Sequence, residues 1–537
     1  MKGTDYASGR RLFKTLSAEE LWKRYCGFLE LTTEEFLAIQ GSLLTEQLQL
    51  AADGTLGRKI LGERPPRTLE ELQSSLPFTT YDDYEPYLSE QREEALAVKP
   101  LAWCHSAGRG GKFKWVPHSE AAMDKVARNC IAFFLLSSAS RRGQINIHPG
   151  MRLLTMMPPV PYTSGTGFAR LRERFTFKPI PTPESVKELP FGEQIGRAFE
   201  VALRDGFDVA GAIASLLLRM GQQMSGQAAK SSKLTAKVLH PKVLFRVLRA
   251  LIKSRGQHRP IYPKDLWNAK GIIATGLDMS IYKDEIEKYW GVQPFDVYAS
   301  TETVLLAMQS WTKKNMTFLP DAAFLEFLPY SPFQTTAPDP RGTVLIDKLE
   351  EGHYYEVIIT QFHGMPLMRY RLGDVIRVVS MGDEDAGVKL PQFEFCRKID
   401  EAINLAALCS LDERTIWRAI ADTGVKYADW TAYKEYDQSE THLRLLIELK
   451  EERTAAEVSA LVDKSLRKVD TDYGDIDHYL QTNPVRTTLL TEGTFARFTE
   501  AKVRAGADLA HLKPKHIEPS REVLEQLFRS GGVKEKQ

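Results

Sequence analysis

Six strand-like segments follow one another between residues 271 and 380, and this run restricts the fold more than any other feature of the chain. They are GIIATGL, FDVYAST, TFLPDAAFLEFLP, GTVLIDKL, YYEVIITQF and DVIRVVS. Each is rich in β-branched or aromatic residues, as strands are. Residues 17–52 and 187–254 instead place apolar side chains at intervals of three and four, which predicts helices. Helices followed by strands predict a large α/β domain.

The sequence changes character after FEFCRKIDEAINL, which ends at Leu405. Beyond it we expect strands in WTAYKEY, HLRLLIELK and VRTTLLT, and helices over residues 454–469 and after Gly493. A chain of 537 residues also exceeds the usual length of one domain. We therefore predict two domains: a large α/β domain of several subdomains at residues 1–398 and a smaller α+β domain at residues 399–537.

Composition excludes several classes of protein. The 71 basic and 70 acidic residues leave a net charge of +1, so no global field favours nucleic acid. The five cysteines are scattered without a C-x-x-C pair, which argues against a disulfide framework or a zinc site. The charged start of the chain lacks the apolar core of a signal peptide, and no apolar stretch approaches the ~20 residues of a membrane span. We expect a cytoplasmic protein without a transmembrane helix.

A glycine-rich segment, HSAGRGGKFKW at residues 105–115, interrupts this pattern. Its backbone amides are suited to wrapping a phosphate, with Ser106 and Lys114 as further donors. The alternative is a flexible basic turn at the surface.

Two later segments carry hydroxyl and carboxylate groups at strand ends. In YASTET, Tyr298, Ser300, Thr301 and Glu302 offer an aromatic face, phosphate donors and a magnesium ligand. The alternative is a helix N-cap. In ITQFHGMPLMRYRLGDVIRVV we expect Tyr370, Arg371 and Asp374 on a tight Leu-Gly-Asp turn between two strands, where the carboxylate accepts the hydroxyls of a ribose. The alternative is a turn aspartate with a structural arginine partner.

In this order and spacing the three segments resemble the phosphate loop, the Y-x-S/T-T-E motif and the Y-R-x-G-D motif of the adenylate-forming superfamily. The flanking segments LPFTTYDDYEPYL, GIIATGLDMSIY, FLEFLP and GTFARFTEAKVRAGADLAHLKPKHI resemble, more specifically, the auxin-responsive acyl acid amido synthetases of plants and their bacterial relatives. The resemblance covers most of the chain. It implies that ATP and Mg²⁺ bind between the large domain and a mobile C-terminal domain.

The resemblance also implies roles for individual residues. The nucleotide contacts would come from Ser106, Gly110, Gly111, Lys114, Tyr298, Ser300, Thr301, Tyr370, Asp374 and Arg397. Among these, Asp374 would bind the ribose, and Arg397 or Lys398 would lie at the hinge. Glu302 would hold magnesium and act with Thr301 in catalysis. Lys513 would be the catalytic lysine, with Lys515 as the competing choice.

The function implied is activation of a carboxylic acid as an acyl adenylate, with release of pyrophosphate, followed by transfer to an amine, an amino acid, to form an amide. The first alternative is an acyl-CoA ligase of the same superfamily. The second is a nucleotide-binding homologue without turnover, because the family loop is approximately S-S-G-T-S-G-G-x-x-K whereas this chain has HSAGRGGKFK, with Arg109 in place of a hydroxyl. The acid itself is not identified; Arg170, Arg172 and Arg174 are candidates for its carboxylate or for surface salt bridges.

A basic segment, residues 209–264, contains eleven Lys or Arg and no Asp or Glu. Within it a helix is expected to carry an apolar face of Val243, Leu244, Val247, Leu248, Leu251 and Ile252, with cations largely opposite. We expect this face to pack on the core. The alternatives are contact with an anionic lipid surface, an acidic carrier protein or the phosphates of coenzyme A.

Overall fold

The computed structural model describes residues 9–62, 64–106, 114–189, 191–227, 240–275, 279–330, 339–399, 402–405, 409–437, 440–470, 473–474, 484–504 and 516–531. Contacts within the chain separate it into two compact units, and the division falls after Ile399.

The first unit begins with helices, as predicted. Ser17 and Thr32 form capping boxes with Glu20 and Glu35, so that each first turn has its backbone donors satisfied. The helices of this unit are α1 (Gly9–Thr15), α2 (Ala18–Cys26), α3 (Thr33–Ala51), α4 (Thr55–Leu61), α5 (Leu69–Ser75), α6 (Glu120–Ser138), α7 (Thr163–Arg174), α8 (Phe191–Asp205), α9 (Ala214–Gln227), α10 (Pro241–Gly256), α11 (Pro263–Leu266) and α12 (Met279–Trp290).

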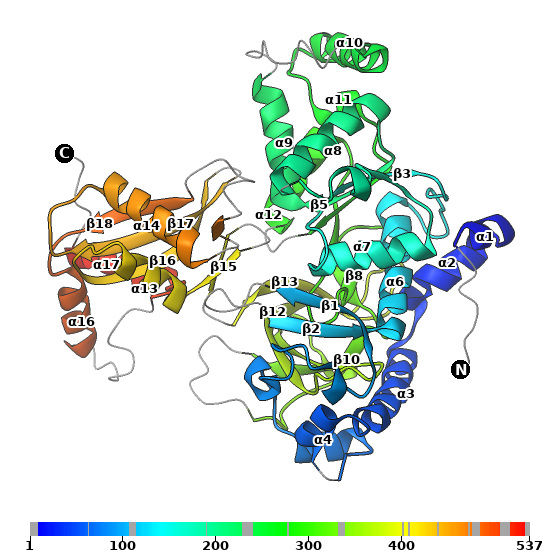
Figure 1. Cartoon of the computed structure of the whole chain (residues 1–537), viewed down its shortest axis with the longest axis horizontal. Coiled ribbons are helices and arrows are strands. Elements are labelled where there is room, and N and C mark those ends of the chain that lie inside the picture. The colour runs from blue at the N-terminus through cyan, green and yellow to red at the C-terminus, as the bar shows by residue number, and fades with distance from the viewer. Residues whose placement is uncertain are drawn as a thin grey trace. The chain divides into compact units, whose positions relative to one another are not determined.

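In the described residues an eleven-stranded sheet forms the centre of this unit, in the order β10-β11-β12-β13-β9-β8-β7-β6-β5-β3-β4. Figure 1 labels β3, β5, β8, β10, β12 and β13 of this sheet. Its strands are β3 (Arg152–Met156), β4 (Lys178–Ile180), β5 (Val209–Ile213), β6 (Gly271–Thr275), β7 (Phe295–Tyr298), β8 (Ala307–Gln309), β9 (Met316–Phe318), β10 (Ala323–Pro329), β11 (Tyr354–Gln361), β12 (Tyr370–Ser380) and β13 (Gln392–Lys398). Strands β3 to β7 are parallel, and the others are antiparallel. The direction therefore changes at β7.

Both faces of the parallel half are covered. Leu153, Val209 and Ile273 belong to one hydrophobic cluster, which also contains the apolar side chains of α6. Their neighbours in sequence, Leu154 and Ala210, belong to a second cluster with α8, α9 and α12. Because successive side chains of a strand point to opposite faces, helices lie on both sides of the sheet. The predicted α/β class of the large domain is confirmed.

Three predictions for single elements were wrong. Residues 209–213 form strand β5, not helix, because a strand buried on both faces is continuously apolar and shows no period of two. GTVLIDKL forms only a bridge from Val344 to Phe327 and a short 3-10 helix, Ile346–Lys348. TFLPDAAFLEFLP is divided between β9 and β10.

Helix α10 also differs from the expectation for the basic segment. Val243 and Ala250 are buried, but Leu244, Leu248 and Ile252 are exposed. Among the described elements, α8 and α11 make the most extensive contacts with this helix, on the side that carries Val243 and Ala250. The apolar face is therefore wider than the surface available to bury it.

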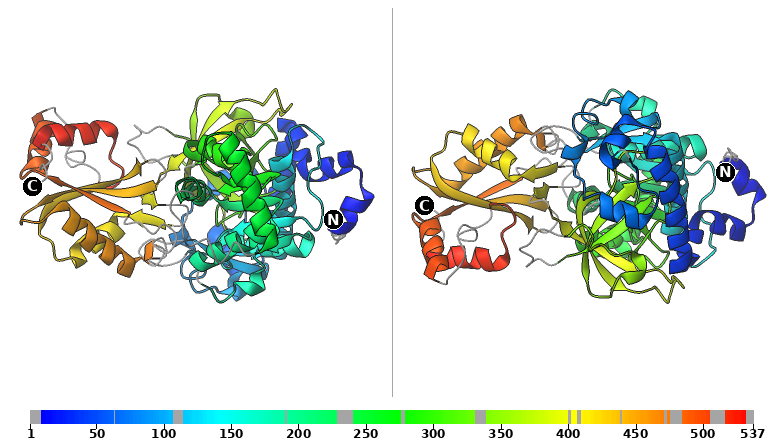
Figure 2. Two further views of the ribbon diagram at one scale, coloured as in Figure 1. Left: turned by 90° about the horizontal axis from the view of Figure 1, so that it is seen from above. Right: turned by 90° about the horizontal axis from the view of Figure 1, so that it is seen from below.

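The second unit is α+β. Its sheet has the order β16 (Tyr427–Asp437), β17 (Glu440–Leu449) and β18 (Val485–Leu490), beside a hairpin of β14 (Ala402–Leu405) and β15 (Cys409–Asp412). Figure 2 shows helices on both faces of this sheet. Helices α13 (Glu413–Asp422) and α14 (Ala455–Val469) pack around Trp430, whereas α16 (Thr494–Arg504) and α17 (Arg521–Gly531) pack around Leu446. No helix in the described parts of either unit is long and apolar enough to cross a membrane.

Candidate active site

The segment after β7 lies at the point where the sheet changes direction. Strand β7 runs parallel to β6 and antiparallel to β8, and residues 299–306 connect β7 to β8. Ligands of α/β sheets bind outside the carboxyl ends of parallel strands, and this segment follows the carboxyl end of β7. Ser300 Oγ accepts the backbone N–H of Thr303 at 3.3 Å, but the residues that follow form a turn and no helix. The N-cap interpretation is therefore wrong.

The last residue of β7 binds a buried carboxylate on β12. The Tyr298 hydroxyl donates to Asp374 Oδ2 at 2.6 Å, and Lys398 Nζ lies 2.5 Å from Oδ1. Asp374 is only 2% exposed. Burial, together with the charge of Asp374, raises the pKa of Tyr298 well above its usual range, so the phenol stays a hydrogen-bond donor. Two partners thus fix the carboxylate.

Asp374 lies in a bulge and not on the predicted turn. Strand β12 is continuous through Leu-Gly-Asp, but its register with β11 shifts between Glu356 and Ile358. Gly373 has φ +72°, a conformation that costs glycine little, and it lies among the extra residues of β12 that form the bulge. The bulge turns the side chain of Asp374 toward Tyr298.

Arg371, the partner that the structural alternative for this motif gives to Asp374, pairs with Glu356 on β11. Its guanidinium donates to both oxygens of Glu356, at 2.8 and 2.7 Å. The ring of Tyr370 is buried, 6.2 Å from that of Tyr84. Arg371 and Tyr370 therefore contribute to the sheet around Asp374.

Two side chains hold the backbone of the Thr301–Glu302 turn. His118, at the end of β2 (Lys114–Ser119), places Nε2 2.9 Å from the carbonyl oxygen of Thr301. Gln361 Nε2 donates to the carbonyl of Glu302 at 2.5 Å. Burial lowers the pKa of His118 to about 4, so its imidazole is neutral at pH 7, with the Nε2 proton required by a carbonyl acceptor.

The strands that flank the glycine-rich loop reach the same place. Strands β1 (Pro100–Ser106) and β2 are antiparallel, with Ser106 opposite Lys114. Lys114 Nζ lies 5.6 Å from the ring centroid of Tyr81, whose hydroxyl bonds with the backbone of Trp115. Burial raises the pKa of Tyr81 to about 12, and the charges of Glu85 and Glu302 add to this increase. The phenol therefore stays protonated beside the backbone of Trp115.

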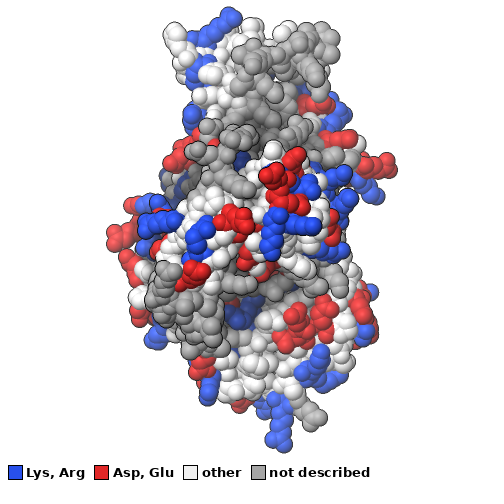
Figure 3. Space-filling view, turned by 90° about the vertical axis from the view of Figure 1, so that its left-hand side faces the viewer, with Lys and Arg blue, Asp and Glu red and all other residues white. Residues whose placement is uncertain are grey.

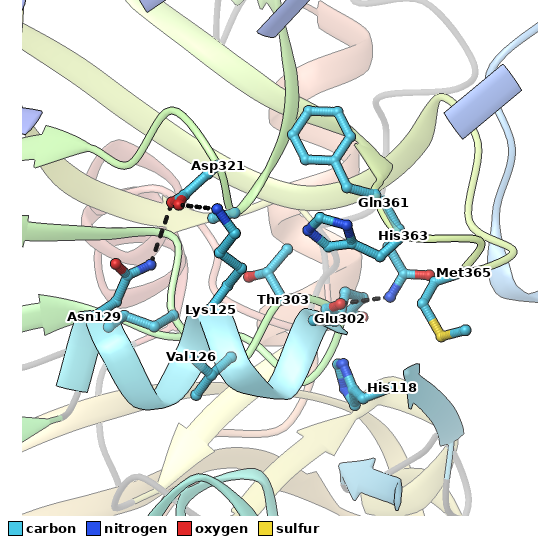
Figure 4. A pocket seen from close by; sticks show the side chains of 14 residues that line it. His118, Lys125, Val126, Asn129, Glu302, Thr303, Asp321, Gln361, His363 and Met365 are labelled. Carbon is cyan, nitrogen blue, oxygen red and sulfur yellow. Dashed lines mark hydrogen bonds and ion pairs between the residues drawn. The ribbon is translucent and has the colours of Figure 1, made fainter. Parts of the chain in front are cut away.

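A pocket opens beside this turn (Figure 4). It is lined by His118, Lys125, Asn129, Glu302, Asp321, Gln361 and His363 together with apolar residues. Lys125 Nζ contacts Asp321 at 3.1 Å. The described residues contain no group of three or more metal-ligating side chains, and Glu302 and Asp321 are the carboxylates that line this pocket.

Several predicted residues cannot be placed. Gly110, Gly111, Lys513 and Lys515 lie outside the described residues, and Ser106 and Arg397 are described by their backbones only. The three arginines proposed for the acid carboxylate pair with the chain's own carboxylates: Arg170 and Arg174 with Asp124, and Arg172 with Glu184.

Sequence analysis missed Tyr81, His118 and Gln361 as parts of the site. Tyr81 lies in TTYDDY and Gln361 in ITQF, both inside segments that carried the family resemblance, so their motifs were a signal. No signal in the sequence indicated His118, because a histidine at the end of an apolar strand is also typical of a residue of the hydrophobic core.

Comparison with known families places these elements in context. Three domain models of one family match in chain order: the GH3 family N-terminal domain at residues 26–166, the central domain at 316–398 and the C-terminal domain at 413–522. The chain belongs to the GH3 family. The GH3 N-terminal match contains His118 and Lys114, the central match contains Asp374, and the C-terminal match contains Lys513. The family predicted from the motifs is confirmed.

Relatives within this family are distant. The chain is 28% identical over 269 residues to a probable indole-3-acetic acid-amido synthetase, GH3.1, of Oryza sativa subsp. japonica, covering 46% of this chain and 42% of the relative. It therefore matches less than half the length of that GH3 protein. A putative indole-3-acetic acid-amido synthetase, GH3.10, of the same plant is 24% identical over 73% of this chain and 84% of its own.

Solved structures share the fold. An acyl acid amido synthetase, AtGH3.15, in complex with 2,4-DB superposes with a TM-score of 0.52 at 16% identity, covering 97% of this chain and 99% of its own. A 2-hydroxyisobutyryl-CoA ligase superposes with a TM-score of 0.55 at 14% identity, covering 87% and 88%. The GH3 chain therefore shares the fold of these two enzymes.

Proposed function

We propose that this protein activates a carboxylic acid with ATP as an acyl adenylate and transfers the acyl group to an amine, forming an amide. One observation carries the proposal: a buried carboxylate, Asp374, is held by Tyr298 and Lys398 beside the turn that carries Thr301 and Glu302. The names of the plant relatives, amido synthetases, support the same chemistry.

The arrangement around Asp374 suits a ribose. A carboxylate accepts up to about four hydrogen bonds, and Tyr298 and Lys398 use one site on each oxygen. Lone pairs remain for the two hydroxyls of a sugar. We assign Thr301, Ser300 and Lys114 to the phosphates, because hydroxyl and ammonium donors meet phosphate oxygens well.

Magnesium also fits the chemistry of this site. Mg²⁺ commonly takes one or two protein carboxylates and completes its shell with phosphate oxygens and water. Glu302 supplies one carboxylate, and ATP would supply the phosphates. When bound, Mg²⁺ would neutralise the charge that develops on the phosphates.

The first step needs positioning more than covalent help. A carboxylate oxygen of the acid attacks the α-phosphorus, and the bond from that phosphorus to pyrophosphate breaks. In the second step the amine nitrogen attacks the acyl carbonyl, and AMP leaves with the electrons of the acyl–oxygen bond. His118 and Gln361 contribute by fixing the carbonyls of Thr301 and Glu302, so that the turn keeps its geometry. We assign Lys513 to the α-phosphate and acyl oxygen, with Lys515 as the alternative.

Pyrophosphate release tests the proposal. The chain is incubated with Mg-ATP, hydroxylamine and pools of aromatic, fatty and jasmonate-like acids. We expect acid-dependent release. Asp374→Asn should lower kcat/KM for ATP at least about tenfold, because two hydrogen bonds to a charged acceptor are weakened. Glu394→Gln, on the exposed surface of β13, is the matched carboxylate control and should retain full activity.

The acceptor is tested separately by AMP release. Release that depends on amino acids supports amide formation, whereas release that depends on coenzyme A would replace the proposal with the acyl-CoA ligase alternative. ATP binding without pyrophosphate release from any pool would indicate the homologue without turnover, for which the Arg109 loop is the first suspect.

A further inference from the structure

Helix α10 exposes large apolar side chains of a kind that monomeric proteins usually bury. Phe245 is 71%, Ile252 67%, Leu244 54% and Leu248 53% exposed, and Leu251 adds a further 36%. Positions 244, 248, 251 and 252, with 245 beside them, follow the helical repeat and form one stripe. We call these five residues the α10 apolar stripe. A contiguous stripe of this kind marks an interaction surface.

The opposite side of α10 is anchored to its own unit. Val243, Ala250 and Ser254 are buried. Arg246 donates to the carbonyl of Ala202 on α8 at 2.9 Å, and Lys253 lies 3.4 Å from the buried carboxylate of Asp265. These contacts hold the helix in place while the stripe stays exposed. Figure 1 shows α10 at the outer edge of the part of the unit that holds α8 and α11.

Exposed cations border the α10 apolar stripe. Arg249 and Arg255 are exposed, and neither forms an ion pair with another described residue. Residues 209–264 contain no Asp or Glu, although the whole chain has a net charge of only +1. In Figure 3 the end of the molecule at the height of α10 shows Lys and Arg among uncoloured residues. The charge is therefore local to this surface.

We propose that α10 docks this protein on an anionic lipid surface, with the apolar stripe in the headgroup–acyl boundary and the cations on lipid phosphates. Interfacial helices combine these properties: a bulky apolar face, flanking Lys and Arg, and an orientation parallel to the membrane. The 16 residues of α10 give a length of about 24 Å, sufficient to lie in the interface.

Other occupants fit the surface less well. A second copy paired through α10 would bring Arg249 and Arg255 of both copies together without a carboxylate in the segment to pair with them. The phosphates of coenzyme A would require a concave basic site, whereas this face is a helix surface covered by apolar side chains. An acidic protein would leave bulky side chains such as Phe245 to be matched by apolar pockets of its own. A lipid surface offers acyl chains to the stripe and phosphates to the cations.

Docking would bring the protein to the phase in which apolar carboxylic acids concentrate, and this consequence rests on the proposed function. The docking itself does not depend on the proposed function, because it requires neither ATP nor turnover.

Vesicle flotation of the full chain tests the proposal. Vesicles of phosphatidylcholine with about 30 mol% phosphatidylglycerol are compared with phosphatidylcholine alone, at low and high salt. We expect binding to the anionic vesicles only, weakened by salt. Phe245→Ser/Leu248→Ser/Ile252→Ser should lower the partition coefficient at least about 100-fold, and Arg249→Gln/Arg255→Gln about 25-fold, about fivefold for each charge.

A matched control removes exposed apolar residues elsewhere. Leu101→Ser/Val160→Ser/Trp417→Ser should float as the wild type does, since these residues are similarly exposed but lie on other elements. Thermal melting of every variant checks that it is folded. Binding by the α10 variant equal to that of the wild type, equal binding to neutral vesicles, or no binding by the wild type would each overturn the proposal. So would light scattering that shows a wild-type dimer and a monomeric α10 variant.

Discussion

The most direct test of the site geometry is the pH dependence of stability caused by His118. Its pKa falls from 6.5 to about 4 because the imidazole is buried, and the hydrogen bond to the carbonyl of Thr301 offsets this fall only in part. The unfolded chain therefore binds a proton at a pH where the folded chain does not, and stability is lost as the pH falls from about 6.5 toward 4. At pH 5 the two pKa values correspond to a loss of about 2 kcal/mol, almost all of which is absent at pH 7.

The assay is a urea titration at pH 7 and at pH 5, followed by tryptophan fluorescence, of the wild type and of His118→Gln. The glutamine amide can still donate to Thr301 but does not titrate. We expect the wild type to lose about 2 kcal/mol more than the variant between the two pH values. His353→Gln removes an exposed histidine and controls for the loss of one imidazole. Equal losses in wild type and His118→Gln would refute the argument that a neutral, buried His118 supports the Thr301 turn.

Two further substitutions test buried polar contacts. Arg369→Ala should lower the free energy of unfolding by about 3–5 kcal/mol in urea titrations, because it leaves the carboxylate of Glu326, itself 1% exposed, without the guanidinium 3.0 Å away. Arg377→Ala removes one partner of an exposed ion pair and should change the free energy of unfolding by less than about 1 kcal/mol. Equal losses of stability in Arg369→Ala and Arg377→Ala would contradict the argument from burial. Tyr298→Phe should cost about 1–3 kcal/mol through the lost bond to Asp374. In an Asp374→Ala background the same change should cost less than half as much, and an undiminished cost would show that the bond is not its cause.

Much of the fold could be predicted from local patterns. The capped helices α2 and α3, the strands β6, β11 and β12 and the α+β texture after residue 405 all follow from periodicity and cap residues. Strand β5 could not be predicted in this way, because a strand buried on both faces lacks a polar face to set a period of two.

Part of the candidate site could likewise be predicted from the sequence, and part could not. The motifs predicted Tyr298, Glu302 and Asp374 as site residues, since hydroxyls and carboxylates at those spacings were recognisable in the sequence. They did not indicate that Tyr298 and Asp374 bond to each other, because 76 positions separate them in the chain. Nor did they indicate that His118 and Gln361 would meet the turn between them.

By itself the sequence determined most of the elements that form and the family to which the chain belongs, because these depend on composition and spacing along a few turns or strands. Only the tertiary structure decided the partners of those residues. The bulge at Gly373 aims Asp374 at Tyr298, although the sequence predicted a turn there. The limited cover from α8 and α11 leaves the α10 apolar stripe exposed, although its pattern predicted burial. Periodicity shows that a helix has an apolar face, but the neighbours that assemble around it decide whether that face is buried.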